Sequence, residues 1–154
     1  MTSNRIVDDI INCIPDDLRH EATVDVSIDS LDGGSESVLR IAPRSQEDAA
    51  CLQIYVTEID SSVSDVVIEF GQDSRLEFDS PAESDVSLLC AICLAVMAGR
   101  VSETVWRVDD EIVRSSARIE LEERVIETST HHVGRGRLRH TDRRSLKYRS
   151  YVMR

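Results

Sequence analysis

The chain has 154 residues, of which 41% are hydrophobic and 31% are charged, and its formal net charge at pH 7 is −11. This length and composition indicate one folded domain with a core of its own and exclude disorder of the whole chain. Aromatic residues make up only 4% of the chain, so we expect an aliphatic core.

Neither a secretory signal nor a membrane-spanning segment is expected. The first residues lead into alternating apolar and acidic types, whereas a secretory signal needs a continuous apolar stretch. The longest apolar run, 86–98, would span about 20 Å as a helix, which is short of the roughly 30 Å of a bilayer core. We therefore expect a cytoplasmic protein without membrane contact, in which the four cysteines are reduced thiols.

Two segments have the patterns of helices. Ile6, Ile10 and Ile14 follow helical spacing, with acidic residues on the other side, which predicts an amphipathic N-terminal helix with a break at Pro15. The segment 80–83, Ser-Pro-Ala-Glu, has the form of a capping box with serine as the N-cap, and Gly99 is a typical residue after a helix end. The central helix between them is apolar nearly all round, so we expect it to be buried.

Alternation of apolar and polar residues predicts strands in the rest of the chain. The order is one helix, five strands, one helix and three strands, and the turns between strands are short. This order favours antiparallel pairing and an α+β fold with a mostly antiparallel sheet, an N-terminal amphipathic helix and one central buried apolar helix. The expected strands are 22–29, 38–42, 52–57, 66–70, 76–78, 104–108, 112–121 and 125–130.

The charge is distributed unevenly along the chain. Residues 1–133 contain 28 Asp and Glu against 10 Lys and Arg, a balance of −18, whereas residues 134–154 contain 1 against 8, a balance of +7. All predicted helices and strands fall in the acidic part. We therefore interpret 1–133 as a single acidic α+β domain and 134–154 as a basic C-terminal tail, extended or partly disordered.

The acidic part predicts a binding surface for a basic protein. Few cations lie near its acids, and an acidic surface of this kind speeds association with a basic partner and adds specificity. The acids proposed to contact such a partner are Asp8, Asp9, Asp16, Asp17, Asp109, Asp110 and Glu111.

The basic tail has three interpretations. Its arginines and the nearby tyrosines, Tyr148 and Tyr151, suit single-stranded RNA or DNA. The tail can also fold onto the acidic body as a strap or an extra strand, or remain a flexible arm, and we favour these two because the opposite charge is tethered beside it. The tail residues expected to make electrostatic contacts are Arg135, Arg137, Arg139, Arg143 and Arg144.

Motifs for catalysis or metal binding are weak. Cys90 and Cys93 form a C-x-x-C pattern, but they lie about two turns inside an apolar helix and have no second cysteine pair, so we interpret them as small core residues. His131 and His132 point to opposite faces if they lie on a strand, so we interpret them as surface residues. We expect no cofactor and no metal site.

The favoured function is that of a non-enzymatic acidic protein that neutralises or escorts a basic protein partner. In size, acidity and fold class the chain is similar to immunity proteins of bacterial toxin systems and to type III secretion chaperones, and no residue motif ties it to either class.

The alternative is a nucleic-acid-associated protein that binds RNA or DNA through its tail. An enzyme that uses an acid pair or a Cys90–Cys93 dithiol is less favoured, because neither a nucleophile–base pair nor a phosphate loop is visible. A homo-oligomer is expected in each case, because the apolar central helix needs covering on several sides.

Overall fold

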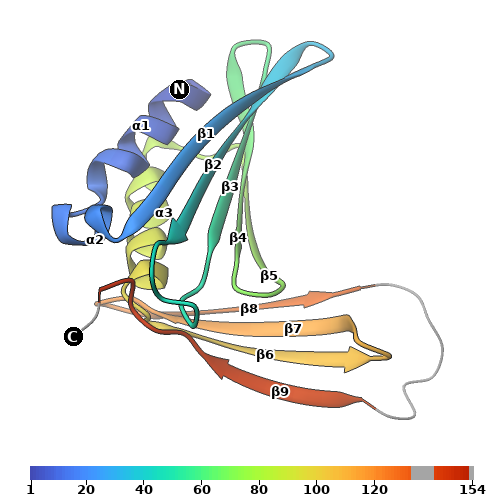
Figure 1. The fold of residues 1–154 in the computed structure, drawn as a ribbon. Coiled ribbons are helices and arrows are strands. Elements are labelled where there is room, and N and C mark those ends of the chain that lie inside the picture. Colours follow the sequence, from blue (N-terminus) through green and yellow to red (C-terminus); the bar gives the residue numbers. More distant parts are fainter. Residues whose placement is uncertain (133–140, 153–154) are drawn as a thin grey trace.

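The computed structural model describes residues 1–132 and 141–152, which form two antiparallel sheets and a layer of helices (Figure 1). The helices are α1 (Ser3–Cys13), α2 (Asp16–His20) and α3 (Glu83–Met97). The first sheet contains, in spatial and sequence order, β1 (Ala22–Leu31), β2 (Gly34–Pro43), β3 (Leu52–Ile59), β4 (Ser62–Phe70) and β5 (Ser74–Asp79). The second sheet has the order β8-β7-β6-β9 and contains β6 (Val101–Val108), β7 (Glu111–Glu120), β8 (Val125–His131) and β9 (Asp142–Lys147).

The predicted α+β class with mainly antiparallel strands is confirmed. Helices α1 and α3 lie side by side on one face of the five-stranded sheet, and the four-stranded sheet lies across its lower end (Figure 1). The face under the helices carries aliphatic residues in register, such as Leu39, Ile54 and Ile68, and all three are fully buried. We call the opposite face of this sheet the outer face.

The N-terminus of helix α1 is capped by a residue from another element and not by its own N-cap side chain. Thr2 is the N-cap and provides no side-chain hydrogen bond. Instead, the backbone N–H of Ser3 donates to the Glu58 carboxylate of β3 at 2.7 Å, and this bond lowers the pKa of Glu58. The break predicted at Pro15 is present, because α1 ends at Cys13 and α2 begins directly after the proline.

Helix α3 begins two residues later than the capping pattern predicts. Ala82 is the N-cap, and its N–H donates to the carboxylate of Asp85 at 2.8 Å, so Ser80 is not the cap. Ser80 instead has a φ of 46° and lies before the helix. The helix end at Gly99 agrees with the sequence pattern, since Gly99 has a φ of 72°.

Helix α3 is buried on most sides but not on all. Ile92, Cys93 and Val96 have no exposed surface, whereas Leu88 and Leu94 are half-buried beside a depression of about 630 Å³ next to the β7–β8 turn. The expected homo-oligomer remains a prediction. Among the helices that the structure describes, none is long and apolar enough to span a bilayer.

Part of the basic C-terminal segment belongs to the fold. Strand β9 pairs with β6, so the four-stranded sheet includes residues on both sides of the charge boundary at 133/134. Tyr151 is completely buried, and its hydroxyl donates to the backbone carbonyls of Ala50 at 2.7 Å and Ile41 at 3.2 Å. Its backbone N–H donates to Met97 at the end of α3. The C-terminal segment therefore completes the core.

Substitutions of Gly99 and Gly33 can test whether the C-terminal segment packs against the end of α3. Both have positive φ, but a Cβ on Gly99 would lie 2.5 Å from the backbone nitrogen of Ser150, whereas a Cβ on Gly33 would meet nothing within 4 Å. We predict that Gly33→Ala lowers the free energy of unfolding by about 1 kcal/mol through backbone strain. Gly99→Ala should lower it by roughly 2 kcal/mol more because of the clash. Urea denaturation measures both, and equal losses would contradict the docking of the C-terminal segment.

Candidate functional site

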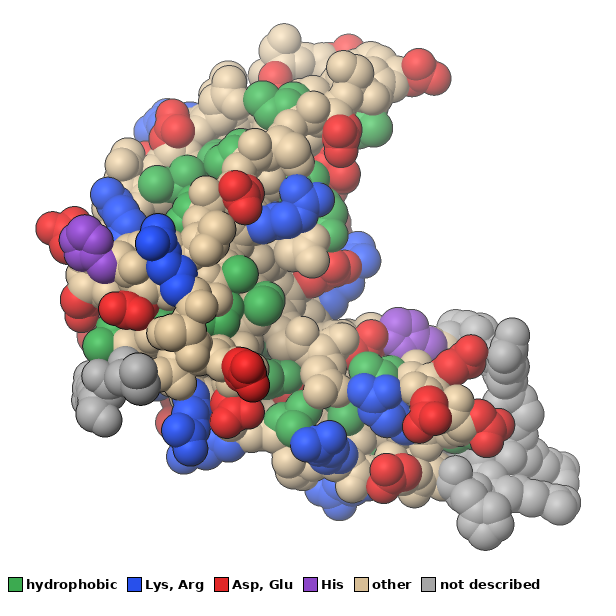
Figure 2. Space-filling model, viewed as in Figure 1, with side chains coloured by type: hydrophobic (Ala, Val, Ile, Leu, Met, Phe, Trp, Pro, Cys, Tyr) green, Lys and Arg blue, Asp and Glu red, His purple; other side chains and the backbone are tan. Residues whose placement is uncertain are grey.

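The two sheets meet at an angle and leave an open cleft of about 560 Å³ between the outer face and β8 (Figure 2). The base of the cleft is the β4–β5 turn. The side chains that line it are mostly polar and include Gln53, Glu69, Asp73, Arg75, Glu77, Thr130 and His132.

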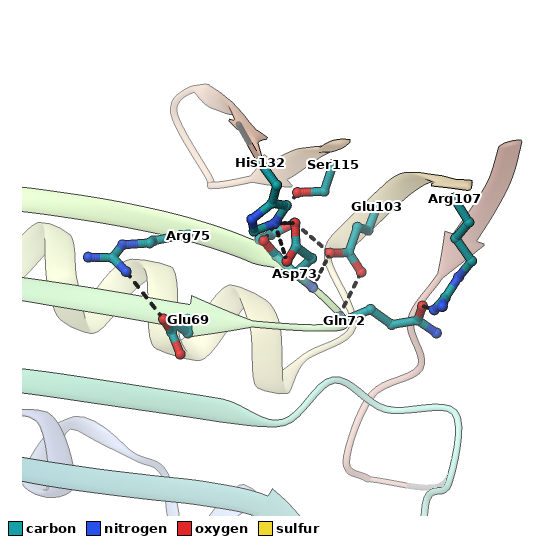
Figure 3. A network of polar contacts seen from close by, with 9 residues as sticks. Glu69, Gln72, Asp73, Arg75, Glu103, Arg107, Ser115 and His132 are labelled. Atoms are coloured by element: carbon teal, nitrogen blue, oxygen red, sulfur yellow. Dashed lines mark hydrogen bonds and ion pairs between the residues drawn. The ribbon is translucent and has the colours of Figure 1, made fainter. Parts of the chain in front are cut away.

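Glu103 of β6 holds the base of the cleft in place (Figure 3). It is only 1% exposed. One carboxylate oxygen accepts the backbone N–H of Asp73 at 2.9 Å and the hydroxyl of Ser74 at 2.7 Å. The other accepts the backbone N–H of Gln72 at 2.9 Å and the hydroxyl of Tyr148. Because a buried carboxylate needs such donors to be stable, Glu103 joins the five-stranded sheet, the four-stranded sheet and the C-terminal segment.

Asp73 and His132 form a fixed pair on one wall of the cleft. The Nε2 atom of His132 lies 2.8 Å from both carboxylate oxygens of Asp73 (Figure 3). The Asp73 carbonyl accepts the hydroxyl of Ser115 at 3.1 Å, and the backbone N–H of His132 donates to Val113 at 3.1 Å. The His132 side chain is 49% exposed, so the pair can form hydrogen bonds with a polar or cationic group in the cleft.

The opposite wall of the cleft carries a neutralised arginine. Arg75 contacts Glu77 at 2.6 Å and Glu69 at 3.5 Å, and all three side chains are exposed by 40% or more. Exposed pairs of this kind stabilise a fold only slightly. A cation from a ligand could therefore compete with Arg75 for Glu69 or Glu77 without unfolding the sheet.

An acidic row crosses the outer face farther from the cleft. The strand register places Asp29 opposite Glu36, and Asp65 opposite Asp79, with Thr57 between the two pairs. Like charges directly opposite each other destabilise a sheet. None of the four carboxylates has an ion pair with an arginine, lysine or histidine that the structure describes.

An apolar row runs beside the acidic row on the same face. It contains Val38, Tyr55 and Val67, which are register partners on β2, β3 and β4. The two valines are buried, and the Tyr55 hydroxyl donates to Gln53 at 2.9 Å. Burial and the neighbouring Glu69 raise the pKa of Tyr55.

The outer face is therefore strongly acidic around an apolar centre. Arg40 and Arg75 are its only cations among the described residues. Its acids were absent from the sequence-based site, although their alternation with apolar residues in the strands was a usable signal. They are Asp25, Asp29, Glu36, Asp65, Glu69, Glu77 and Asp79.

The acids proposed from the sequence lie on two separate surfaces. Asp8, Asp9, Asp16 and Asp17 are on α1 and α2, on the helical side of the molecule, whereas 109–111 covers the β6–β7 turn and the first residue of β7 at the far end of the other sheet (Figure 1). Asp9 lies 3.9 Å from Arg5, and the Asp110 carbonyl accepts a hydrogen bond from Arg107. The structure does not bring these seven acids together.

The basic tail also divides into parts with different surroundings. Arg143 and Arg144 lie on β9 and are exposed, whereas Arg135, Arg137 and Arg139 lie outside the described residues. The interpretation of Tyr148 and Tyr151 as residues that stack on bases is wrong. The Tyr148 hydroxyl is bound to Glu103, and Tyr151 is in the core.

The cysteines do not form the pair that C-x-x-C indicates. Cys93 is buried, as expected for a core residue, and burial raises the pKa of its thiol. The thiol of Cys90 contacts that of Cys13 on α1, and this hydrogen bond raises the pKa of Cys13 and lowers that of Cys90. Within residues 1–132 and 141–152, no group of three or more His, Cys, Asp or Glu side chains has the arrangement of a metal site.

Comparisons with known protein families, curated proteins and solved structures find no match for this chain. The function is therefore inferred from the surfaces and side chains described above.

The role of Glu103 can be tested by Glu103→Gln. In this variant an amide nitrogen, which is itself a donor, would replace one carboxylate oxygen and face the donors that this oxygen accepts. We therefore predict a loss of about 2–4 kcal/mol in the free energy of unfolding. The control is Glu127→Gln, which removes an exposed contact with Arg118 at 3.2 Å and should change stability by less than about 0.5 kcal/mol. Similar losses in both variants, measured by urea denaturation, would refute the central role of Glu103.

The environment of the Tyr148 hydroxyl predicts that the free energy of unfolding depends on pH. Burial and the bond to Glu103 raise the pKa of Tyr148 well above its ordinary value near 10. The folded protein therefore keeps this proton longer than the unfolded chain, so the stabilisation is complete below about pH 10 and declines above it. We predict that the unfolding free energy of Tyr148→Phe is lower at neutral pH but falls less steeply between about pH 9 and 11. Urea denaturation at each pH measures this, and parallel curves of unfolding free energy against pH for the wild type and the variant would contradict the prediction.

Proposed function

We propose that this protein binds a basic protein partner on the outer face of its five-stranded sheet, with the cleft at one end of the binding surface. The acidic row carries the proposal. Asp29 and Glu36, and Asp65 and Asp79, face each other as like-charged pairs. Such pairs lower the stability of the isolated protein, and a row of cations from a partner would relieve the repulsion.

The apolar row supports a protein partner over a small cation. Tyr55 is the part-exposed member of this row and offers an apolar contact between acidic residues, with the buried Val38 and Val67 on either side, and interfaces commonly have an apolar centre with a polar rim. A partner segment with alternating apolar and basic residues would match both rows. In the cleft, Glu69 and Glu77 would receive further cations in competition with Arg75.

The proposed role is to neutralise or escort the partner without chemistry. Immunity proteins and secretion chaperones act in this general way, and both need a stable folded surface. The enzymatic alternative has weaker support, because the hydrogen bonds of the His132 side chain go to Asp73 and the hydroxyl of Ser74 is bound to Glu103.

Two variants with equal charge changes test the proposal. One replaces Asp29, Glu36 and Asp79 by Asn, Gln and Asn on the outer face, and the other replaces Asp8, Asp16 and Asp17 by Asn on the helical side. Binding of a fluorescent peptide of alternating arginine and leucine is measured by anisotropy. We predict that the outer-face variant binds at least about 5-fold more weakly and that the helical-side variant changes less than about 2-fold.

The same variants give a second readout. Relief of like-charge repulsion should raise the unfolding free energy of the outer-face variant by roughly 0.5 kcal/mol. The helical-side variant should lose a few tenths of a kcal/mol, because Asp16 and Asp17 lie in the first turn of α2. Equal weakening of peptide binding in both variants would show an effect of net charge alone and would refute the proposed site.

A further inference from the structure

The four-stranded sheet has a second, chemically different face. The strand register places His131, Arg114, Trp106 and Arg143 in one row across β8, β7, β6 and β9. None of these side chains is buried, and no helix covers this side of the sheet among the described residues (Figure 1). We call this side, opposite the one that carries Glu103, the basic face.

Trp106 stands between two arginines on the basic face. The guanidinium carbon of Arg114 lies 4.6 Å from the ring centroid, and that of Arg143 lies 5.6 Å from it. These contacts fix two long side chains that would otherwise be mobile, and they leave the guanidinium N–H groups with no ion pair to a described acid. The row therefore presents two guanidinium groups in defined positions beside an aromatic ring.

Hydroxyl groups form the next row of the basic face. Thr104, Ser116, Ser129 and Ser145 are register partners, and the hydroxyls of Thr104 and Ser145 lie 3.2 Å apart. The first three of these residues line a shallow depression of about 490 Å³. Hydroxyl groups bind phosphate and sugar oxygens without adding charge.

The acids on the basic face are already paired. Glu120 and Glu127 lie 3.6 Å and 3.2 Å from Arg118, so one guanidinium offsets half of the charge of the two carboxylates. Lys147 lies beside them opposite Ser102 and has no ion pair with a described residue. Arg114, Arg143 and Lys147 therefore remain available to an anion, and the acidic row of the other sheet is on a different face.

We infer that the basic face binds single-stranded nucleic acid, with Trp106 and the guanidinium groups of Arg114 and Arg143 over its ring as the central contact. A guanidinium beside an exposed aromatic ring can stack with a base while its N–H groups bind phosphate. Lys147 and the hydroxyl row would contact the backbone of the strand. This site differs from the acidic outer face in both ligand and location, and it does not depend on the proposed function.

The recognition chemistry favours a single strand over other polyanions. An open sheet face with one aromatic side chain and two arginines over its ring suits unstacked bases, which are accessible only in single strands. A ligand with phosphate alone would use the cations and leave the ring contacts unchanged. Trp106 is the only tryptophan in the chain, so its fluorescence reports directly on this row.

The test titrates the full chain with unlabelled oligo(dT) and oligo(rU) of about 20 nucleotides at roughly 50 mM salt. We expect quenching of Trp106 fluorescence and, in anisotropy with labelled strands, a log–log salt slope of about −2 for three phosphate contacts. Arg114→Gln combined with Arg143→Gln should weaken binding at least about 10-fold. The control is Arg40→Gln on the outer face, which should leave the affinity unchanged.

Three outcomes would overturn the inference. One is the absence of both quenching and an anisotropy change at low salt. Another is equal affinity for inorganic polyphosphate or heparin, which would indicate charge attraction without base recognition. The third is equal weakening by the Arg40 variant and the double arginine variant. Circular dichroism of each variant confirms that the fold is retained, and Lys147→Gln provides a second, milder variant of the same face.

Discussion

The arrangement of the two sheets depends on one buried carboxylate. Glu103 lies on a strand of the four-stranded sheet, yet two of its hydrogen-bond donors belong to the turn between β4 and β5, a third is Ser74 at the start of β5, and the fourth is Tyr148. A buried charge with these donors has one stable position, because any slip of the sheets leaves it unsatisfied. The cleft, its Asp73–His132 wall and the direction of both open faces follow from that contact.

The fold separates charge by surface. Residues 1–98, which form the helices and the five-stranded sheet, contain 20 Asp and Glu against 5 Arg, a balance of −15, whereas the residues described after position 98 contain 9 acids against 9 Lys and Arg and are neutral in sum. The open faces of the two sheets still differ, because strand register collects unpaired acids on the outer face and places Arg114, Arg143 and Lys147 together on the basic face.

Much of the local structure was predictable, because it depends on neighbours in sequence. Alternation found every strand of the five-stranded sheet, and helical spacing with Pro15 found α1 and its end. The capping pattern at Ser80 predicted α3 but misplaced its start, because Asp85 offers a better acceptor to Ala82. The candidate site was less predictable. Sequence analysis selected acids that are adjacent along the chain. Asp29 and Asp79 lie on β1 and β5, and they belong to one row only because five strands pair in register.

The sequence by itself determined the class of fold, the positions of most elements and the presence of an excess of acid. These properties follow from periodicity, turn residues and composition, which act over a few residues. Only the tertiary structure decided which charges share a surface, that Tyr148 and Tyr151 belong to the core contacts, and that Trp106 lies between Arg114 and Arg143. Those outcomes depend on strand register and on the burial of Glu103, which bring together residues that are far apart along the chain.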